Sequence, residues 1–155
     1  MRELVAKKST KEIKELFKLD IEEQMLKKIL QVYVVDGRIK FFKDLYNDHK
    51  YLFEAPKYKP ELLVFKKSNK IKTLKGLKLA EQGLENLKNW AKIEAIKSSI
   101  HKVVNDNTDL SFGDVFWPVR VALSGRENSP SPEELLWILD KEESQTRIKK
   151  ALASS

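Results

Sequence analysis

The sequence contains no cysteine, which excludes disulfide bonds, thiolate catalysis and zinc–thiolate sites. It also lacks a hydrophobic run long enough to cross a bilayer, so we expect no membrane-spanning segment. The N-terminus shows no apolar stretch of the kind that a secretory signal requires. Cytoplasmic residence fits these absences. Hydrophobic residues make up 41% of the 155-residue chain, an ordinary share, so we expect a folded protein with a buried core.

Residue patterns that mark catalytic or metal sites are also missing from the sequence. The five glycines form no G-x-G or G-K-[ST] phosphate loop. The two histidines, His49 and His101, have no second ligand at metal-binding spacing. Adjacent carboxylates such as Glu133 and Glu134 fit the first turn of a helix, where the helix dipole stabilises negative charge. We therefore expect no catalytic residue, no metal site and no cofactor in this chain.

Positive charge is abundant and unevenly distributed. The net charge is +7, and residues 1–120 carry 25 basic against 17 acidic side chains. Eight lysines lie between Lys57 and Lys78, where Glu61 is the one acidic residue. A basic stripe of this kind is typical of a protein that binds a polyanion such as nucleic acid. Solvated helix faces would explain the same charges, so this pattern alone leaves both interpretations open.

Apolar residues recur at helical spacing along most of the chain, and no alternating strand pattern of useful length appears. We therefore predict an all-α protein of seven to nine short helices in two packed subdomains, residues 1–58 and 59–155. Pro118 is expected to kink or restart its helix, because proline cannot donate a backbone hydrogen bond. The predicted helices begin after Ser9 and Asp20 and at Arg38, span residues 70–87 and 91–104, and begin again after Ser111 and Ser131.

The stretch from Phe116 to Leu139 indicates two helices joined by a sharp polar turn. Gly125 follows the last apolar residue of the first helix, where a left-handed cap is easiest for glycine. Ser131, Pro132 and Glu134 then form the pattern of a helix start, with a capping hydroxyl and a carboxylate three residues later. Free backbone groups at the two helix ends, beside the arginine of the turn, suit recognition of a flat polar edge or a phosphate.

The same region carries a family resemblance. Its motifs are P-V-R-V-A-L-S-G, a following S-P, then L-L-W-I-L-D-K-E and R-I-K-K-A-L. This pattern, from Asp114 to Leu152, resembles the C-terminal anticodon-binding region of bacterial-type glutamyl-tRNA synthetases. Upstream, D-G-R-I-K-F-F-K-D-L and K-Y-L-F are collinear with the first half of that region. Asp140 stands where the family usually has glycine, and a left-handed aspartate is tolerable there.

The resemblance implies that two helical subdomains read the anticodon loop of tRNA-Glu. The bases of the loop would splay out and lie against the subdomains. Arg38 would contact the third anticodon base and favour cytosine over guanine. Arg120 matches the arginine of the family's P-L-R motif and would contact the anticodon bases or their backbone. Phosphate contacts are expected from Lys66, Lys67 and Lys70. The turn expected to pack on the second and third anticodon bases comprises Ser129, Pro130, Ser131 and Pro132.

The resemblance covers about the last third of such an enzyme, and the family's two nucleotide-binding signatures are missing from this sequence. The chain alone should therefore be inactive, with ATP and Mg²⁺ acting only in the catalytic domain of the parent ligase. We expect the isolated chain to be a monomer. Two alternatives remain open at this point: a freestanding helical RNA-binding module, and a helical protein–protein adaptor whose basic face is only solvated.

Overall fold

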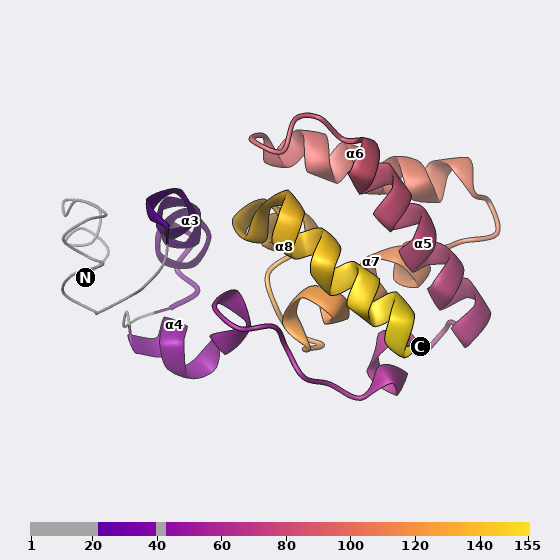
Figure 1. The fold of residues 1–155 in the computed structure, drawn as a ribbon, viewed down its shortest axis with the longest axis horizontal. Coiled ribbons are helices and arrows are strands. Elements are labelled where there is room, and N and C mark those ends of the chain that lie inside the picture. Colours follow the sequence, from indigo (N-terminus) through magenta and orange to yellow (C-terminus); the bar gives the residue numbers. More distant parts are fainter. Residues whose placement is uncertain (1–21, 40–42) are drawn as a thin grey trace. The chain divides into compact units, whose positions relative to one another are not determined.

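The computed structural model describes residues 22–39 and 43–155. Within these residues every regular element is helical and no strand is present, so the all-α prediction is confirmed. The chain divides into two compact units, Met1–Glu54 and Ala55–Ser155, which we describe in turn (Figure 1). The short helix predicted after Ser9 lies outside the described residues.

The first unit contains α3 (Glu23–Ile29), which continues directly into a π-helical segment, η1 (Leu30–Val35). The sequence predicted this helical run and its interruption at Asp36 and Gly37, and the break lies there, with φ 72° at Gly37. After it come α4 (Lys43–Asp48) and a 3-10 turn, η2 (Lys50–Leu52). The buried side chains of this unit include Leu26, Ile29, Val32, Tyr33, Leu45, Tyr51 and Leu52.

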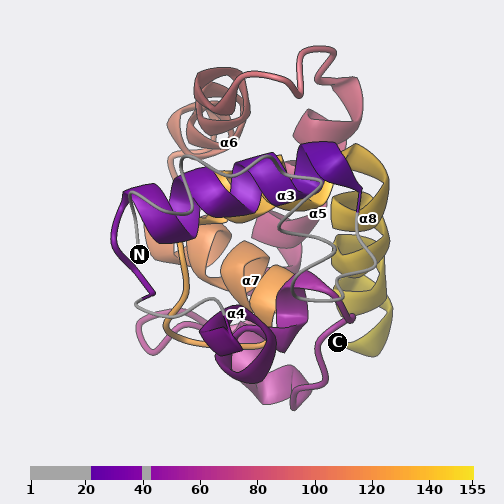
Figure 2. The same ribbon diagram turned by 90° about the vertical axis from the view of Figure 1, so that its left-hand side faces the viewer.

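The second unit is a packed array of helices around α7. Its elements are η3 (Pro60–Leu63), α5 (Lys70–Asn86), α6 (Ile93–Asp106), α7 (Phe112–Ser124) and α8 (Pro132–Ser154). The central α7 contacts all the others, and both views show it beside α8 (Figures 1 and 2). Burial of one apolar stripe from each helix drives this packing. Its core includes Leu77, Leu84, Ile96, Ile100, Val115, Val119, Leu123, Leu135, Ile138 and Ile148.

We expected a kink or a new helix start at Pro118. The residue lies inside α7, and there is no new start. Proline has no N–H, so the carbonyl of Asp114 loses its usual helical partner. This carbonyl faces Gly76 of α5, where an added Cβ would lie 2.2 Å from the carbonyl oxygen. Because Gly76 has no side chain, α5 can cross α7 directly over the carbonyl of Asp114.

The described residues form fewer α-helices than the seven to nine that we predicted. Pro56 and Pro60 keep the segment 55–69 out of α-helix, and it forms only the 3-10 turn η3. Near the other end of the unit, α8 is interrupted at Asp140, with φ 65° and ψ 175°. The sequence predicted a left-handed residue there. The positive φ agrees, but this ψ is far from the left-handed helical value near 47°.

Candidate nucleic-acid interface

The turn between α7 and α8 is built by the caps that the sequence predicted. Gly125 ends α7 in the left-handed conformation, φ 69° and ψ 15°, which glycine adopts without steric cost. Ser131 begins α8: its hydroxyl accepts from the N–H of Glu134, whose carboxylate in turn accepts from the N–H of Ser131. The hydroxyl of Ser124 accepts from the N–H of Arg126 at 3.1 Å. Both ends of the turn are therefore fixed by local hydrogen bonds.

The exposed part of this turn is not the part that we singled out from the sequence. Arg126, Glu127 and Asn128 are exposed, whereas Pro130 and Pro132 are buried. Ser129 is half-buried and donates to the carbonyl of Pro130 at 2.8 Å. From the sequence we assigned the contacts to Ser129, Pro130, Ser131 and Pro132, and not to Arg126 and Asn128. Their polarity between two capping signals was the clue that they would face solvent.

Arg120 lies on the last turns of α7, before Gly125, and is half-buried. Its Nε atom is buried and has no hydrogen-bond partner. Asp114, an acidic residue at the start of the same helix, accepts from the backbone N–H and hydroxyl of Ser111, at 2.7 and 3.0 Å. Over the described ranges, Arg120 forms no ion pair with Asp114 or with Glu127. Its guanidinium thus keeps donors for a ligand.

Arg38 belongs to the first unit, whereas the other candidate residues belong to the second. It is exposed, in the bend after Gly37, and its backbone N–H donates to the carbonyl of Tyr33 at 2.9 Å. We expected Arg38 to open a helix, and this was wrong: Arg38 and Ile39 are not helical, and α4 includes Lys43–Asp48. The positive φ of Gly37 turns the chain at this point, and burial of Ile39 holds it.

The lysine-rich segment runs from η3 into the start of α5. Lys66, Lys67 and Lys70 are exposed, and Asn69 between them caps α5 by accepting from the N–H of Lys72 at 2.9 Å. Lys75 and Lys78, further along, pair with Asp109 and Glu81. In the part of the chain that the structure describes, Lys66, Lys67 and Lys70 form no ion pair. The structure therefore distinguishes these three lysines, which have no acidic partner among the described residues, from Lys75 and Lys78, which do.

The capping carboxylate of α7 has a pKa shifted by its surroundings. Burial of Asp114 acts to raise its pKa, but the hydrogen bonds from Ser111 and the nearby charge of Lys72 outweigh this effect. The pKa of Asp114 consequently lies below its usual value, and the carboxylate stays charged at neutral pH.

No cluster of three or more metal-ligating side chains occurs in residues 22–39 and 43–155. Nor does any helix within those ranges have the length and apolar character to cross a membrane.

Comparison with known proteins shows which family the chain matches. Residues 5–152 match the anticodon binding domain family. The chain is 30% identical over 154 residues to a glutamate–tRNA ligase of Clostridium botulinum (strain Eklund 17B / Type B), covering 91% of this chain and 29% of that protein. It is 32% identical to a glutamate–tRNA ligase of Azobacteroides pseudotrichonymphae, covering 96% of this chain and 30% of that protein.

Solved structures give the same result. The crystal structure of a glutamate tRNA ligase from Elizabethkingia meningosepticum, in complex with its amino acid, superposes with a TM-score of 0.76 at 26% identity. That match covers 99% of this chain and 31% of the other. The chain thus spans slightly under a third of the length of these relatives. The resemblance seen between Asp114 and Leu152 is confirmed. The chain belongs to the anticodon binding domain family and is homologous to the C-terminal region of glutamyl-tRNA synthetases.

Proposed function

We propose that this chain binds the anticodon arm of tRNA-Glu on behalf of a glutamate–tRNA ligase. The observation that carries the proposal is the match of residues 5–152 to the anticodon binding domain family, which leaves almost none of the chain unaccounted for. In the parent enzyme, a catalytic domain would join glutamate to the tRNA with ATP and Mg²⁺. This chain would couple correct anticodon reading to that reaction, with both cofactors bound elsewhere.

Arg38 and Arg120 are the proposed base readers. Arg38 is exposed in its bend, where the guanidinium can meet the O2 and N3 acceptors of cytosine at the third anticodon position. Guanine presents N–H donors on the same edge and would be disfavoured. Arg120 is half-buried near the end of α7, and its terminal guanidinium nitrogens would contact a base edge or a backbone phosphate beside the turn.

The turn that begins at Gly125 would supply the remaining anticodon contacts. Its backbone is fixed at both ends, so ordering it on RNA costs little entropy. Ser129, Pro130, Ser131 and Pro132 shape the turn, and the exposed Arg126 and Asn128 offer donors to base edges. The uncompensated Lys66, Lys67 and Lys70 would hold phosphates of the arm without regard to sequence.

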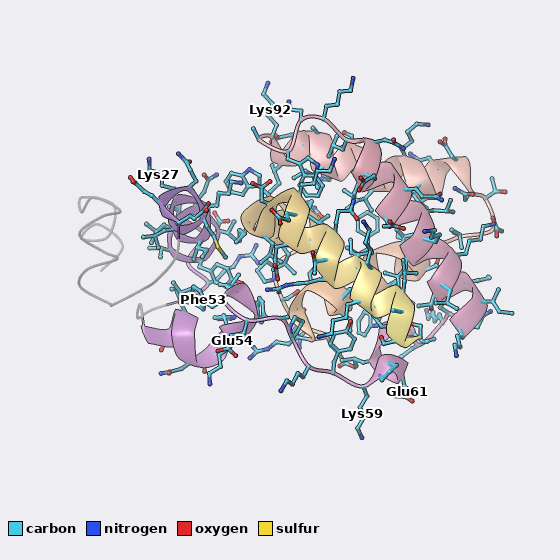
Figure 3. The ribbon with its side chains drawn as sticks, in the orientation of Figure 1. Lys27, Phe53, Glu54, Lys59, Glu61 and Lys92 are labelled. Atoms are coloured by element: carbon cyan, nitrogen blue, oxygen red, sulfur yellow. The ribbon has the colours of Figure 1, made fainter. Side chains whose placement is uncertain are left out.

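The test is binding of the chain to two anticodon stem-loops that differ only in cytosine or guanine at the third anticodon base. We expect tighter binding of the cytosine form, by roughly 1–3 kcal/mol for a bidentate arginine contact. Arg38→Gln should remove this preference, and Arg120→Ala should weaken both complexes. Lys92→Gln removes a charge from an exposed site at the start of α6, and it serves as the matched control (Figure 3).

Equal, salt-dependent binding of the two stem-loops would mean that the chain contacts phosphates without reading the anticodon, as a general RNA-binding module would. Absence of binding at low salt would reject the RNA proposal for the isolated chain and favour a protein–protein adaptor. A loss of affinity as large in Lys92→Gln as in Arg120→Ala would show that only net charge matters.

A further inference from the structure

A cavity of about 210 Å³ lies in the second unit, between the segment 55–60, α7 and the end of α8. Pro56, Tyr58, Pro60 and Ala122 supply apolar walls, and three cationic residues, Lys57, Arg147 and Lys150, line it as well. No aspartate or glutamate lines the cavity. An apolar pocket lined also by cationic side chains, with no acidic side chain in its wall, suits a ligand that is partly apolar and negatively charged.

The cavity is separate from the proposed anticodon contacts of Arg120. Ala122 follows Arg120 by two residues, which places the two side chains about 200° apart around α7. The cavity therefore opens on the opposite side of the helix from Arg120. Its wall nevertheless reaches the α7–α8 turn, because an added Cβ at Gly125 would lie 2.8 Å from Pro56 and 3.4 Å from the ring of Tyr58.

The cationic side chains differ in how they are held. Arg147 is only 3% exposed, and its guanidinium donates to the carboxylate of Glu143 at 2.8 Å and to the carbonyl of Leu123 at 2.6 Å. It is a fixed part of the cavity floor. Lys57 and Lys150 come from different elements, are exposed, and form no ion pair among the residues that the structure describes. Lys59, by contrast, points away from the unit into solvent (Figure 3).

Tyr58 gives the cavity a flat aromatic surface. Like any tyrosine, it is protonated at neutral pH and able to donate a hydrogen bond, and burial raises the pKa of its phenol further. Stacking of a nucleobase on such a ring tolerates any base, because every base has a π-face. At about 210 Å³ the space is below the roughly 300–1,000 Å³ of drug-sized pockets, so it suits one base rather than two.

We propose that this cavity binds a single nucleoside monophosphate unit, with the base against Tyr58 and the phosphate between Lys57 and Lys150. The choice of a nucleotide among anionic ligands rests on the proposed function. The unit has two sources, a free mononucleotide or one nucleotide of an RNA strand, and both present the same chemistry to the cavity.

The test uses the whole chain, labelled with ¹⁵N and titrated with AMP, adenosine, inorganic phosphate and a short oligoadenylate. We expect saturable amide shifts at Tyr58 and Ala122 with AMP or the oligonucleotide, and about tenfold weaker binding of adenosine and phosphate. The double variant Lys57→Gln and Lys150→Gln should weaken binding about tenfold, as should Tyr58→Leu, whereas Tyr58→Phe should retain most of the affinity. Lys92→Gln with Lys97→Gln removes the same charge from α6 and should change nothing.

Saturation by AMP identifies a free mononucleotide, and saturation by the oligonucleotide alone identifies an RNA nucleotide; both support the proposal. It is overturned if neither ligand shifts Tyr58 and Ala122, or if the α6 control loses as much affinity as the cavity variant. Failure of the proposed function is recognised separately. The cavity variants should leave the cytosine-to-guanine preference of the stem-loops intact, whereas failure of anticodon reading removes that preference in the unmodified chain.

Discussion

Asp140 is a residue whose backbone conformation suits another amino acid. Its φ of 65° with ψ 175° belongs to a region that glycine occupies and that costs other residues about 1–3 kcal/mol. Asp140→Gly should therefore raise the free energy of unfolding by about 1 kcal/mol, after the greater chain entropy of glycine is subtracted. Thermal and urea unfolding measure this change. Asp140→Ala keeps the Cβ and loses the acceptor for the N–H of Lys141, so it should not stabilise. Equal stability of the two variants would contradict the argument.

Arg147 is a buried cation whose partners fix the end of α7. Removal of its guanidinium in Arg147→Met leaves the carbonyl of Leu123 without its donor and the carboxylate of Glu143 without its partner. We expect a loss of about 2–4 kcal/mol in urea unfolding. Lys149→Met, at an exposed position on the same helix, should stay within about 0.5 kcal/mol of the parent chain. Similar losses in the two variants would mean that burial of Arg147 is not the cause.

Arg120 and Pro130 show why the sequence predicted the candidate site only in part. Motif position identified both, because the motif is local. Whether a side chain in a turn is buried depends on packing from distant elements, and the sequence did not show that Pro130 would be covered while Arg126 and Asn128 stayed exposed. The three uncompensated lysines were likewise distinguishable from Lys75 only once Asp109 was placed beside it.

At the scale of elements, the crossing of α5 and α7 depends on one glycine. An added Cβ at Gly76 would lie 2.2 Å from the carbonyl oxygen of Asp114, so Gly76→Ala must push the helices apart. We expect a loss of about 1–3 kcal/mol. Gly83 lies seven residues later on α5, where a Cβ would meet Ser99 and Val103 at ordinary distances of 3.5 and 3.6 Å. Gly83→Ala should instead stabilise by about 0.5–1 kcal/mol, because alanine favours helix. Calorimetry of the two variants tests the contrast directly.

The capping box of α7 predicts a specific dependence of stability on pH. The folded-state pKa of Asp114 lies below the ordinary value, so its contribution is present above about pH 4 and is lost as pH falls through the folded pKa. Asp114→Asn should cost about 1 kcal/mol near neutral pH, a typical value for a helix cap, and progressively less below pH 4. Urea unfolding at several pH values measures the difference between the two chains. A difference that stays constant down to acid pH would assign the effect to packing rather than charge.

Elements were predictable where their signals were local. Ser111, Gly125 and Ser131 marked helix ends correctly, because a cap is decided by the residue and its nearest backbone groups. The π-helical segment Leu30–Val35 and the unbroken helix through Pro118 were not predictable in this way. Both depend on packing: the freed carbonyl of Asp114 is accommodated by Gly76, which lies almost forty residues earlier in the chain.

For the chain as a whole, the division into two units depends on how the segment between the helices packs. We placed the boundary after residue 58, at the prolines that end the first apolar segment. In the structure the first unit ends at Glu54 and the second begins at Ala55. Pro56 and Tyr58 lie next to Gly125, whose missing side chain leaves them room, so this part of the segment packs within the second unit. Composition marks a linker, but only tertiary packing shows which unit it joins.

The exposed lysines before and at the start of α5 predict how RNA affinity responds to salt. Each lysine that neutralises a phosphate releases a counterion, which adds about 0.7–0.9 to the slope of log affinity against log salt. Replacement of Lys66, Lys67 and Lys70 by glutamine should therefore lower the slope by about two to three and weaken the cytosine and guanine stem-loops equally. The same substitutions at Lys88, Lys92 and Lys97 remove identical charge from exposed sites around the start of α6 and should leave the slope nearly unchanged.

Fluorescence titrations at several salt concentrations measure both quantities in one series. If the two triple variants change the slope equally, the RNA responds to the overall field of the protein and not to the lysines before α5. If the first variant alters the cytosine preference as well as the slope, these lysines also position the arm for base reading. The prediction holds only if slope and preference separate, because phosphates set affinity while base edges carry the sequence information.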